Sequence, residues 1–455
     1  MPESLDAIAA WMLERARAAG ADEAEVWLQE SKRFSASVRL GTLETLTEAT
    51  ARSLELRLFV DQRLARAASS DLRRDTLAAL VERAVERARL GSQDPFAGLP
   101  AEADEGVKPA VSSVGPSPSE LSLYDPAVEA LSTEEKIALA REAESIGLKL
   151  DPRIQNSGGA GVHTRSSQVW LGNSRGFRGG YRATSLSLGL HLLGQEGGSA
   201  AQVSDYWYSA ARQRAKLDSP EQVARVAVER VRRHFGARKL PTQEVAVVFE
   251  PLLGAELLSD LFGALSGEAI YLRRSFLVDA LGQKVAAPGV TVVDDGLLPG
   301  GLGSRPFDRE GVPSQRTPVI ENGLLRNYLC GTYSARKLKR RSTGNGTGDG
   351  EAPTNFYLAA GPHAPEEILR SVPRGLYVTR LIGQGMNLVT GDYSRGAFGL
   401  WIEDGRLTHP VHEITIGGNL RRMLESMEMV GSDLDFRDQF AAPTLKIASM
   451  TVAGT

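Results

Sequence analysis

The segment 264–272 contains Glu268, a carboxylate of the kind that metal-assisted hydrolysis uses to activate water. Glu268 follows a run of leucines at helical spacing that begins near Pro251, so the run predicts a helix that ends beside this glutamate. On a helix of the His-Glu-x-x-His kind, two imidazoles bind zinc and the glutamate activates the metal-bound water. No histidine flanks Glu268. Glu268 is then either a residue facing a substrate channel or a surface carboxylate at a helix end.

A glycine-rich segment, 342–350, is the second candidate. Its glycines permit positive φ and close approach by another chain, and successive free amides in such a loop can hold an anion or a peptide carboxylate. The order G-x-x-x-x-G-K-[ST] of a phosphate loop is not clear here, so nucleotide binding is not favoured. A flexible surface loop is the alternative. The short motif Pro353-Thr354-Asn355 follows this segment and is considered together with it. The candidate substrate-binding residues are then Glu268, Ser342, Thr343, Gly344, Asn345, Gly346, Thr354 and Asn355.

Other catalytic arrangements are weaker. His409 and His412 are three residues apart, and on a strand this spacing directs them to opposite faces. The acids in loops between 294 and 311 lack the regular spacing of a calcium or magnesium site. No G-x-S-x-G nucleophile motif occurs. The residues therefore predict no catalytic group and no metal site in this chain alone.

Composition limits the class of protein. The chain has 455 residues, 42% apolar and 24% charged, which predicts a folded protein of two or three domains. A net charge of -3 gives no case for nucleic-acid binding. No apolar run is long enough to span a membrane, and the first residues do not resemble a signal peptide. The single cysteine, Cys330, fits a reducing compartment, so we expect a cytoplasmic protein without a membrane partner.

The pattern of elements predicts an α+β fold. Apolar stripes at helical spacing predict helices over 4–19, 71–90, 133–147 and 219–235, and alternating patterns predict strands between 25 and 60. Glycine clusters divide 154–210 into a β-meander, and a segment rich in Pro, Gly and Ser, 91–118, reads as a linker or an extended crossing. The predicted units are an N-terminal helix-and-strand domain with its linker, a β-rich middle domain and a strand-rich C-terminal domain: 1–115, 116–240 and 241–455.

A series of short motifs carries a family resemblance. In chain order they are Ser275-Phe276-Leu277, Phe307-Asp308-x-Glu310-Gly311, Thr332-Tyr333-Ser334-Ala335-Arg336, Ser342-Thr343-Gly344-Asn345, Pro353-Thr354-Asn355, Gly391-Asp392-Tyr393-Ser394, Pro410-Val411-x-Glu413-Ile414 and the final Met450-Thr451-Val452-Ala453-Gly454. In this order and spacing the motifs resemble the TldD/PmbA (TldD/TldE) metallopeptidase family. The resemblance covers nearly the whole chain and is strongest from about residue 240.

The resemblance implies that the zinc ligands are missing. TldD subunits carry His-Glu-x-x-x-His, which falls here on Gly267, Glu268 and Leu272, and a ligand cysteine in the C-terminal tail. Neither Gly267 nor Leu272 can bind a metal, and the segment 431–442 has no cysteine. The chain therefore resembles the TldE/PmbA branch, whose members carry no zinc and pair with a TldD subunit.

This branch implies a heterodimer in which the TldD-like partner supplies zinc. The two chains would enclose a chamber that admits unfolded peptides, and this chain would shape the chamber. Two alternatives remain open from the sequence: a non-catalytic homodimer that binds peptides, and an independent hydrolase whose site is not recognised.

Overall fold

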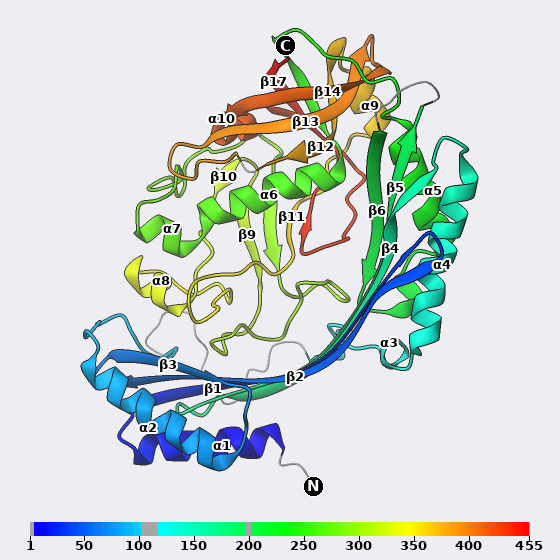
Figure 1. Ribbon diagram of the computed structural model, residues 1–455. Helices are drawn as coiled ribbons and strands as arrows, with labels where there is room; N and C mark the ends of the chain where they lie inside the picture. Colours follow the sequence, from blue (N-terminus) through cyan, green and yellow to red (C-terminus); the bar gives the residue numbers. More distant parts are fainter. Residues whose placement is uncertain (1–3, 102–116, 197–201, 384, 455) are drawn as a thin grey trace.

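A long, curved six-stranded sheet forms the first half of the protein (Figure 1). The computed structural model describes residues 4–101, 117–196, 202–383 and 385–454. Every neighbouring pair of strands in this sheet is antiparallel, in the order β3-β2-β1-β4-β5-β6. The strands are β1 (Glu23–Arg39), β2 (Thr42–Val60), β3 (Arg63–Ser69), β4 (Asn156–Asn173), β5 (Arg178–Gln195) and β6 (Gln202–Ala211).

Helices cover the convex face of this sheet at its two ends (Figure 1). One end holds α1 (Leu5–Ala18) and α2 (Arg74–Leu90), whose apolar stripes pack on Leu54, Leu56 and Leu58. The other end holds α4 (Thr133–Leu150) and α5 (Pro220–Arg232). Because side chains alternate along each strand, the opposite, concave face of the sheet packs against other parts of the chain. The short helices α3 (Pro126–Glu129) and η1 (Arg214–Lys216) lie in the connections.

The concave face curves around the C-terminal half, which contains two further sheets (Figure 1). Their strand orders are β10-β9-β8-β11-β16 and β14-β13-β12-β7-β17-β15. The strands are β7 (Gln243–Phe249), β8 (Val292–Asp295), β9 (Arg316–Glu321), β10 (Leu324–Leu325), β11 (Phe356–Leu358), β12 (Arg374–Ile382), β13 (Asp392–Glu403), β14 (Arg406–Asn419), β15 (Met427–Val430), β16 (Phe440–Ala441) and β17 (Leu445–Ala453). The helices are α6 (Pro251–Leu265), α7 (Gly267–Tyr271), α8 (Thr332–Lys337), α9 (Pro365–Arg370) and α10 (Leu420–Glu425).

The apolar helix α6 contributes to one core with residues of both C-terminal sheets. Leu257, Leu261 and Leu265 are almost fully buried in it, together with Val247 and Phe356. The leucine spacing in the sequence therefore predicted the buried face of the helix correctly. The helix itself is shorter than expected. Ser266 is extended, with φ -65° and ψ 138°, and separates α6 from α7. Its hydroxyl accepts a hydrogen bond from the Ala269 amide at 3.2 Å and so caps the second helix.

The predicted α+β fold is confirmed: a helix-and-strand N-terminus, an antiparallel meander and a strand-rich C-terminal half. The division at 1–115 and 116–240 stays a prediction, and strands from these two stretches share one sheet. Most of the predicted linker, residues 102–116, lies outside the described residues. In the part of the chain that is described, no helix combines the length and apolarity needed to cross a bilayer.

Candidate functional site

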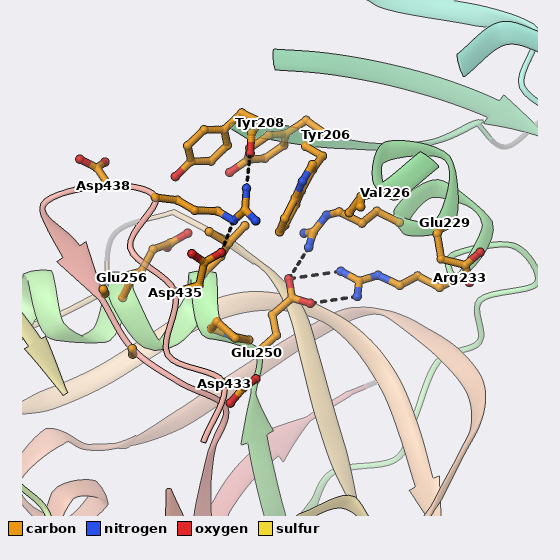
Figure 2. Close-up of a pocket in the computed structure, with 18 of the residues that line it drawn as sticks. Tyr206, Tyr208, Val226, Glu229, Arg233, Glu250, Glu256, Asp433, Asp435 and Asp438 are labelled. Atoms are coloured by element: carbon orange, nitrogen blue, oxygen red, sulfur yellow. Dashed lines mark hydrogen bonds and ion pairs between the residues drawn. The ribbon is translucent and has the colours of Figure 1, made fainter. Parts of the chain in front are cut away.

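A cavity of about 900 Å³ lies where β6 and α5 meet the start of α6 and the segment 433–442, as Figure 2 shows. Tyr206 and Tyr208 project from the same face of β6 and their rings stack, with centroids 6.4 Å apart. Trp207, Val226 and Phe440 also line the cavity. Its walls thus combine aromatic surface with the charged side chains described next.

The cations at the base of this cavity are neutralised. Glu250 accepts a hydrogen bond from Arg230 at 2.7 Å and pairs with Arg233 at 2.9 Å. Asp205 forms an ion pair with Arg230 at 3.2 Å and contacts His234 at 3.1 Å. Because these side chains are largely buried, the pairing offsets the cost of removing each charge from water. The cluster fixes α5 against the start of α6.

The segment before β17 is held across the same cavity. Asp433 accepts hydrogen bonds from the amide and hydroxyl of Thr444, at 2.9 and 2.7 Å. Arg437 pairs with Asp218 at 2.9 Å and lies over the ring of Trp207, 4.6 Å from its centroid. Phe440 of this segment packs edge-to-face on Phe262 of α6, with ring centroids 6.2 Å apart.

A bound zinc would need ligands that this cavity does not offer. Among the residues that the structure describes, none in its lining is a histidine or cysteine. Asp433 is engaged by Thr444, and Glu256 pairs with Arg395 at 2.8 Å. Across the described ranges, no group of three His, Cys, Asp or Glu side chains is arranged to hold a metal ion. The residues present do not fit a zinc site.

Glu268 lies in a second cavity, of about 610 Å³, between the concave face of the first sheet and α7 and α8. Tyr271 and Tyr333 form an edge-to-face pair there, with centroids 5.8 Å apart. The Glu268 amide donates to Glu351 Oε2 at 3.2 Å, and Ser334 donates to Oε1 of the same carboxylate. Burial raises the pKa of Glu351, and the charge of Glu268 adds to this effect.

The positions matched to the two zinc-binding histidines differ in burial. Gly267 is buried, and a Cβ built on it would lie 2.5 Å from Ser334 Oγ and 2.9 Å from Cys330 Sγ. Leu272 follows α7 and is 40% exposed. Segment 431–442, where a third ligand is expected, packs on α6 instead.

We therefore expect that Gly267→His will not create a metal site. The imidazole would overpack against Ser334 and Cys330, at a cost of about 1–3 kcal/mol in the free energy of unfolding. Denaturant unfolding and zinc titration of the variant measure both effects. The control is Leu272→His, which places the same side chain at an exposed position and should leave stability nearly unchanged. Tight zinc binding by the Gly267 variant with unchanged stability would contradict this expectation.

The other candidate residues support the loop that borders the second cavity. Asn345 is fully buried and donates to Asp294 at 2.7 Å, and Asn355 donates to the Asp295 carbonyl at 2.6 Å. Gly344 has φ +71°, and a Cβ at Gly346 would lie 2.5 Å from Glu310. The remaining three candidates also form hydrogen bonds to other atoms of the protein: Ser342, Thr343 and Thr354. Contact of these residues with a substrate stays a prediction.

A buried ionic cluster next to the second cavity is absent from the sequence-based candidates. Arg57 of β2 pairs with Glu25 of β1 at 3.2 Å and with Glu310 of the C-terminal half at 3.0 Å. Asp308 accepts from the Gly346 amide at 2.8 Å. The motif Phe307-Asp308-x-Glu310-Gly311 was the available signal, but the partner arginine lies about 250 residues away in the chain. The cluster joins the sheet to the loop that carries the candidate residues.

Comparison with known proteins decides the family. Three domain models match: PmbA/TldA metallopeptidase domain 1 over residues 24–88, the central domain over 126–235 and the C-terminal domain over 242–454. The chain belongs to the PmbA/TldD metallopeptidase family. The family resemblance read from the motifs is thereby confirmed.

Relatives of this PmbA/TldD family member match along most of their length. The chain is 35% identical to Metalloprotease PmbA of Escherichia coli O157:H7, over 95% of this chain and 92% of that protein. A solved structure from Bacteroides thetaiotaomicron, named for a link to DNA gyrase, is 27% identical with a TM-score of 0.89, covering 99% of both chains. TldE from Thermococcus kodakarensis shares the fold, with a TM-score of 0.87 at 22% identity, covering 98% of this chain and 100% of that one.

Proposed function

We propose that this chain is the TldE/PmbA-like subunit of a two-subunit peptidase. The partner would be a TldD-like chain that supplies zinc, and the substrate an unfolded peptide. The observation that carries the proposal is the combination of 35% identity to Metalloprotease PmbA with residues that fit no zinc site. Without bound zinc, a water cannot be activated by the metal in this chain. Its contribution is then to shape the space in which the partner's site acts, in the cytoplasm.

Two features support a role in peptide binding. The 900 Å³ cavity presents Tyr206 and Tyr208 beside the outer strand of a sheet, and aromatic surface of this kind can accept side chains of many types. The 610 Å³ cavity is bordered by Glu268 and by the loop residues 348–351. An extended peptide bound mainly through its backbone would be accepted with little dependence on its sequence.

The metal content of the chain tests this proposal. We expect the purified chain to hold far less than one zinc per molecule and to leave unfolded peptides uncleaved. Elemental analysis after dialysis, together with cleavage of a quenched fluorescent peptide, measures both quantities. One tightly held zinc per chain with cleavage by the chain alone would assign the activity to this subunit and overturn the proposal.

A further inference from the structure

Two arginines face each other on the concave side of the first sheet. Arg33 of β1 is the register partner of Arg165 of β4. Pairing between these strands is continuous from Trp27 to this point, and side chains alternate along a strand. Trp27 and Val169 pack against Phe307 of the C-terminal half. Arg33 and Arg165 therefore also point toward the concave face.

Neither guanidinium has an anionic partner among the described residues. Within the part of the chain that the structure describes, no ion pair or hydrogen bond involves the side chain of Arg33 or Arg165. Other arginines that face this side differ: Arg57 pairs with two glutamates, and Arg309 pairs with Glu55 at 2.6 Å. Burial and the charge of Arg33 lower the pKa of Arg165. Like charges directly opposite each other destabilise a sheet, so the pair is unfavourable without a ligand.

The surroundings of the pair are polar, and they are exposed on the side of His163 and buried at Ser31. On the same face, the neighbouring register pairs are Ser31 with Ser167 and Ser35 with His163. His163 and Arg33 are exposed, and Arg165 is half-buried. None of these four neighbouring side chains is a carboxylate. They therefore do not neutralise the charges of the two guanidinium groups.

We propose that Arg33 and Arg165 bind a carboxylate group of an extended peptide. Each guanidinium presents a planar fork of N–H donors that matches the two oxygens of a carboxylate, and two forks side by side supply both charge and orientation. The carboxylate can come from the C-terminus of the peptide or from an acidic side chain. That the ligand is a peptide rests on the proposed function, whereas the unpaired cations do not.

Peptide binding to the full chain tests this site. The probes are one fluorescent peptide without Asp or Glu, prepared with a free C-terminal acid and as the amide, and a third, amidated peptide with one glutamate. By fluorescence anisotropy, we expect the free acid to bind about tenfold more tightly than the amide, as a charge-assisted hydrogen bond would give. Arg33→Gln and Arg165→Gln should each abolish the difference. If the glutamate peptide binds like the free acid, the same site accepts side-chain carboxylates.

A matched control separates the site from general charge effects. Arg52→Gln removes an arginine of the same sheet that pairs with Glu30 at 2.7 Å on the other face, and it should retain the preference for the acid. Thermal unfolding checks the fold, and loss of one like charge should leave Arg33→Gln at least as stable as the parent. Equal binding of acid, amide and glutamate peptides, or a preference that survives in both arginine variants, overturns the proposal. Peptide cleavage on mixing with a partner is measured separately, so failure here leaves the proposed function standing.

Discussion

Replacing Arg57 by methionine should cost about 3–5 kcal/mol in the free energy of unfolding, because it leaves buried carboxylates without their cation. The Arg57 side chain is only 11% exposed and pairs with Glu25 and Glu310, whose side chains are 5% and 4% exposed. Methionine fills a similar volume, so the measured loss would report mainly the uncompensated charge. Denaturant unfolding followed by circular dichroism measures it.

Arg52→Met is the matched control for this loss. Arg52 lies on the same strand and pairs with Glu30, but about half of its side chain is exposed, at 48%. An exposed pair contributes about 0–1 kcal/mol. A loss for Arg57→Met no larger than the loss for Arg52→Met would show that the buried cluster does not hold the sheet to the C-terminal half.

The same cluster should make stability depend on pH through Glu25. Burial raises the pKa of Glu25 from 4.5 to about 7, even though Arg57 acts in the opposite direction. Burial and the charge of Glu310 also raise the pKa of Asp308. The charge of Arg57 holds the pKa of Glu310 below its ordinary value against the effect of burial. The carboxyl groups of Glu25, Asp308 and Glu310 thus lie near the single guanidinium of Arg57. The raised pKa values of Glu25 and Asp308 mean that these two groups bind protons more readily than usual, which reduces the excess negative charge.

The sign of the effect follows from where the proton is held. Between pH 4.5 and 7 the folded chain keeps the Glu25 proton while the unfolded chain loses it, so this contribution to stability falls as pH rises. Comparison with Glu25→Gln, which cannot titrate, isolates the residue from other groups. We expect the stability of the parent relative to the variant to fall by about 3 kcal/mol across this window. A difference that stays constant from pH 4.5 to 7.5 would place Glu25 in a solvated environment.

Local patterns in the sequence predicted the longer helices of the first half and parts of its strands. The alternation of Leu54, Leu56 and Leu58 predicts one face of β2, and Gly172-Asn173 marks the end of β4, whereas Gly158 and Gly159 lie inside that strand. The pairing of β1 with β4 could not be predicted in this way, because periodicity reports which face is buried but not which distant strand lies alongside. One continuous sheet therefore spans two stretches that composition separates.

The candidate site illustrates a second limit. Glu268 lines a cavity, yet Asn345 and Asn355 hydrogen-bond inside the protein. A polar residue in a glycine-rich loop has the same appearance in a sequence whether it satisfies a buried protein group or faces a ligand. The break at Ser266 had a usable signal, since serine is a favoured N-cap, but the surrounding apolar run concealed it.

Peptide cleavage on mixing with a TldD-like chain from the same organism tests whether this chain is one subunit of a two-subunit peptidase. The measurement compares this chain, the partner and their mixture on one unfolded peptide, with the bound zinc of each preparation determined in parallel. We expect cleavage to appear, or to rise strongly, only in the mixture, and the zinc to be bound by the partner. Cleavage by this chain alone with its own zinc, or partner activity that is the same with and without this chain, would contradict it.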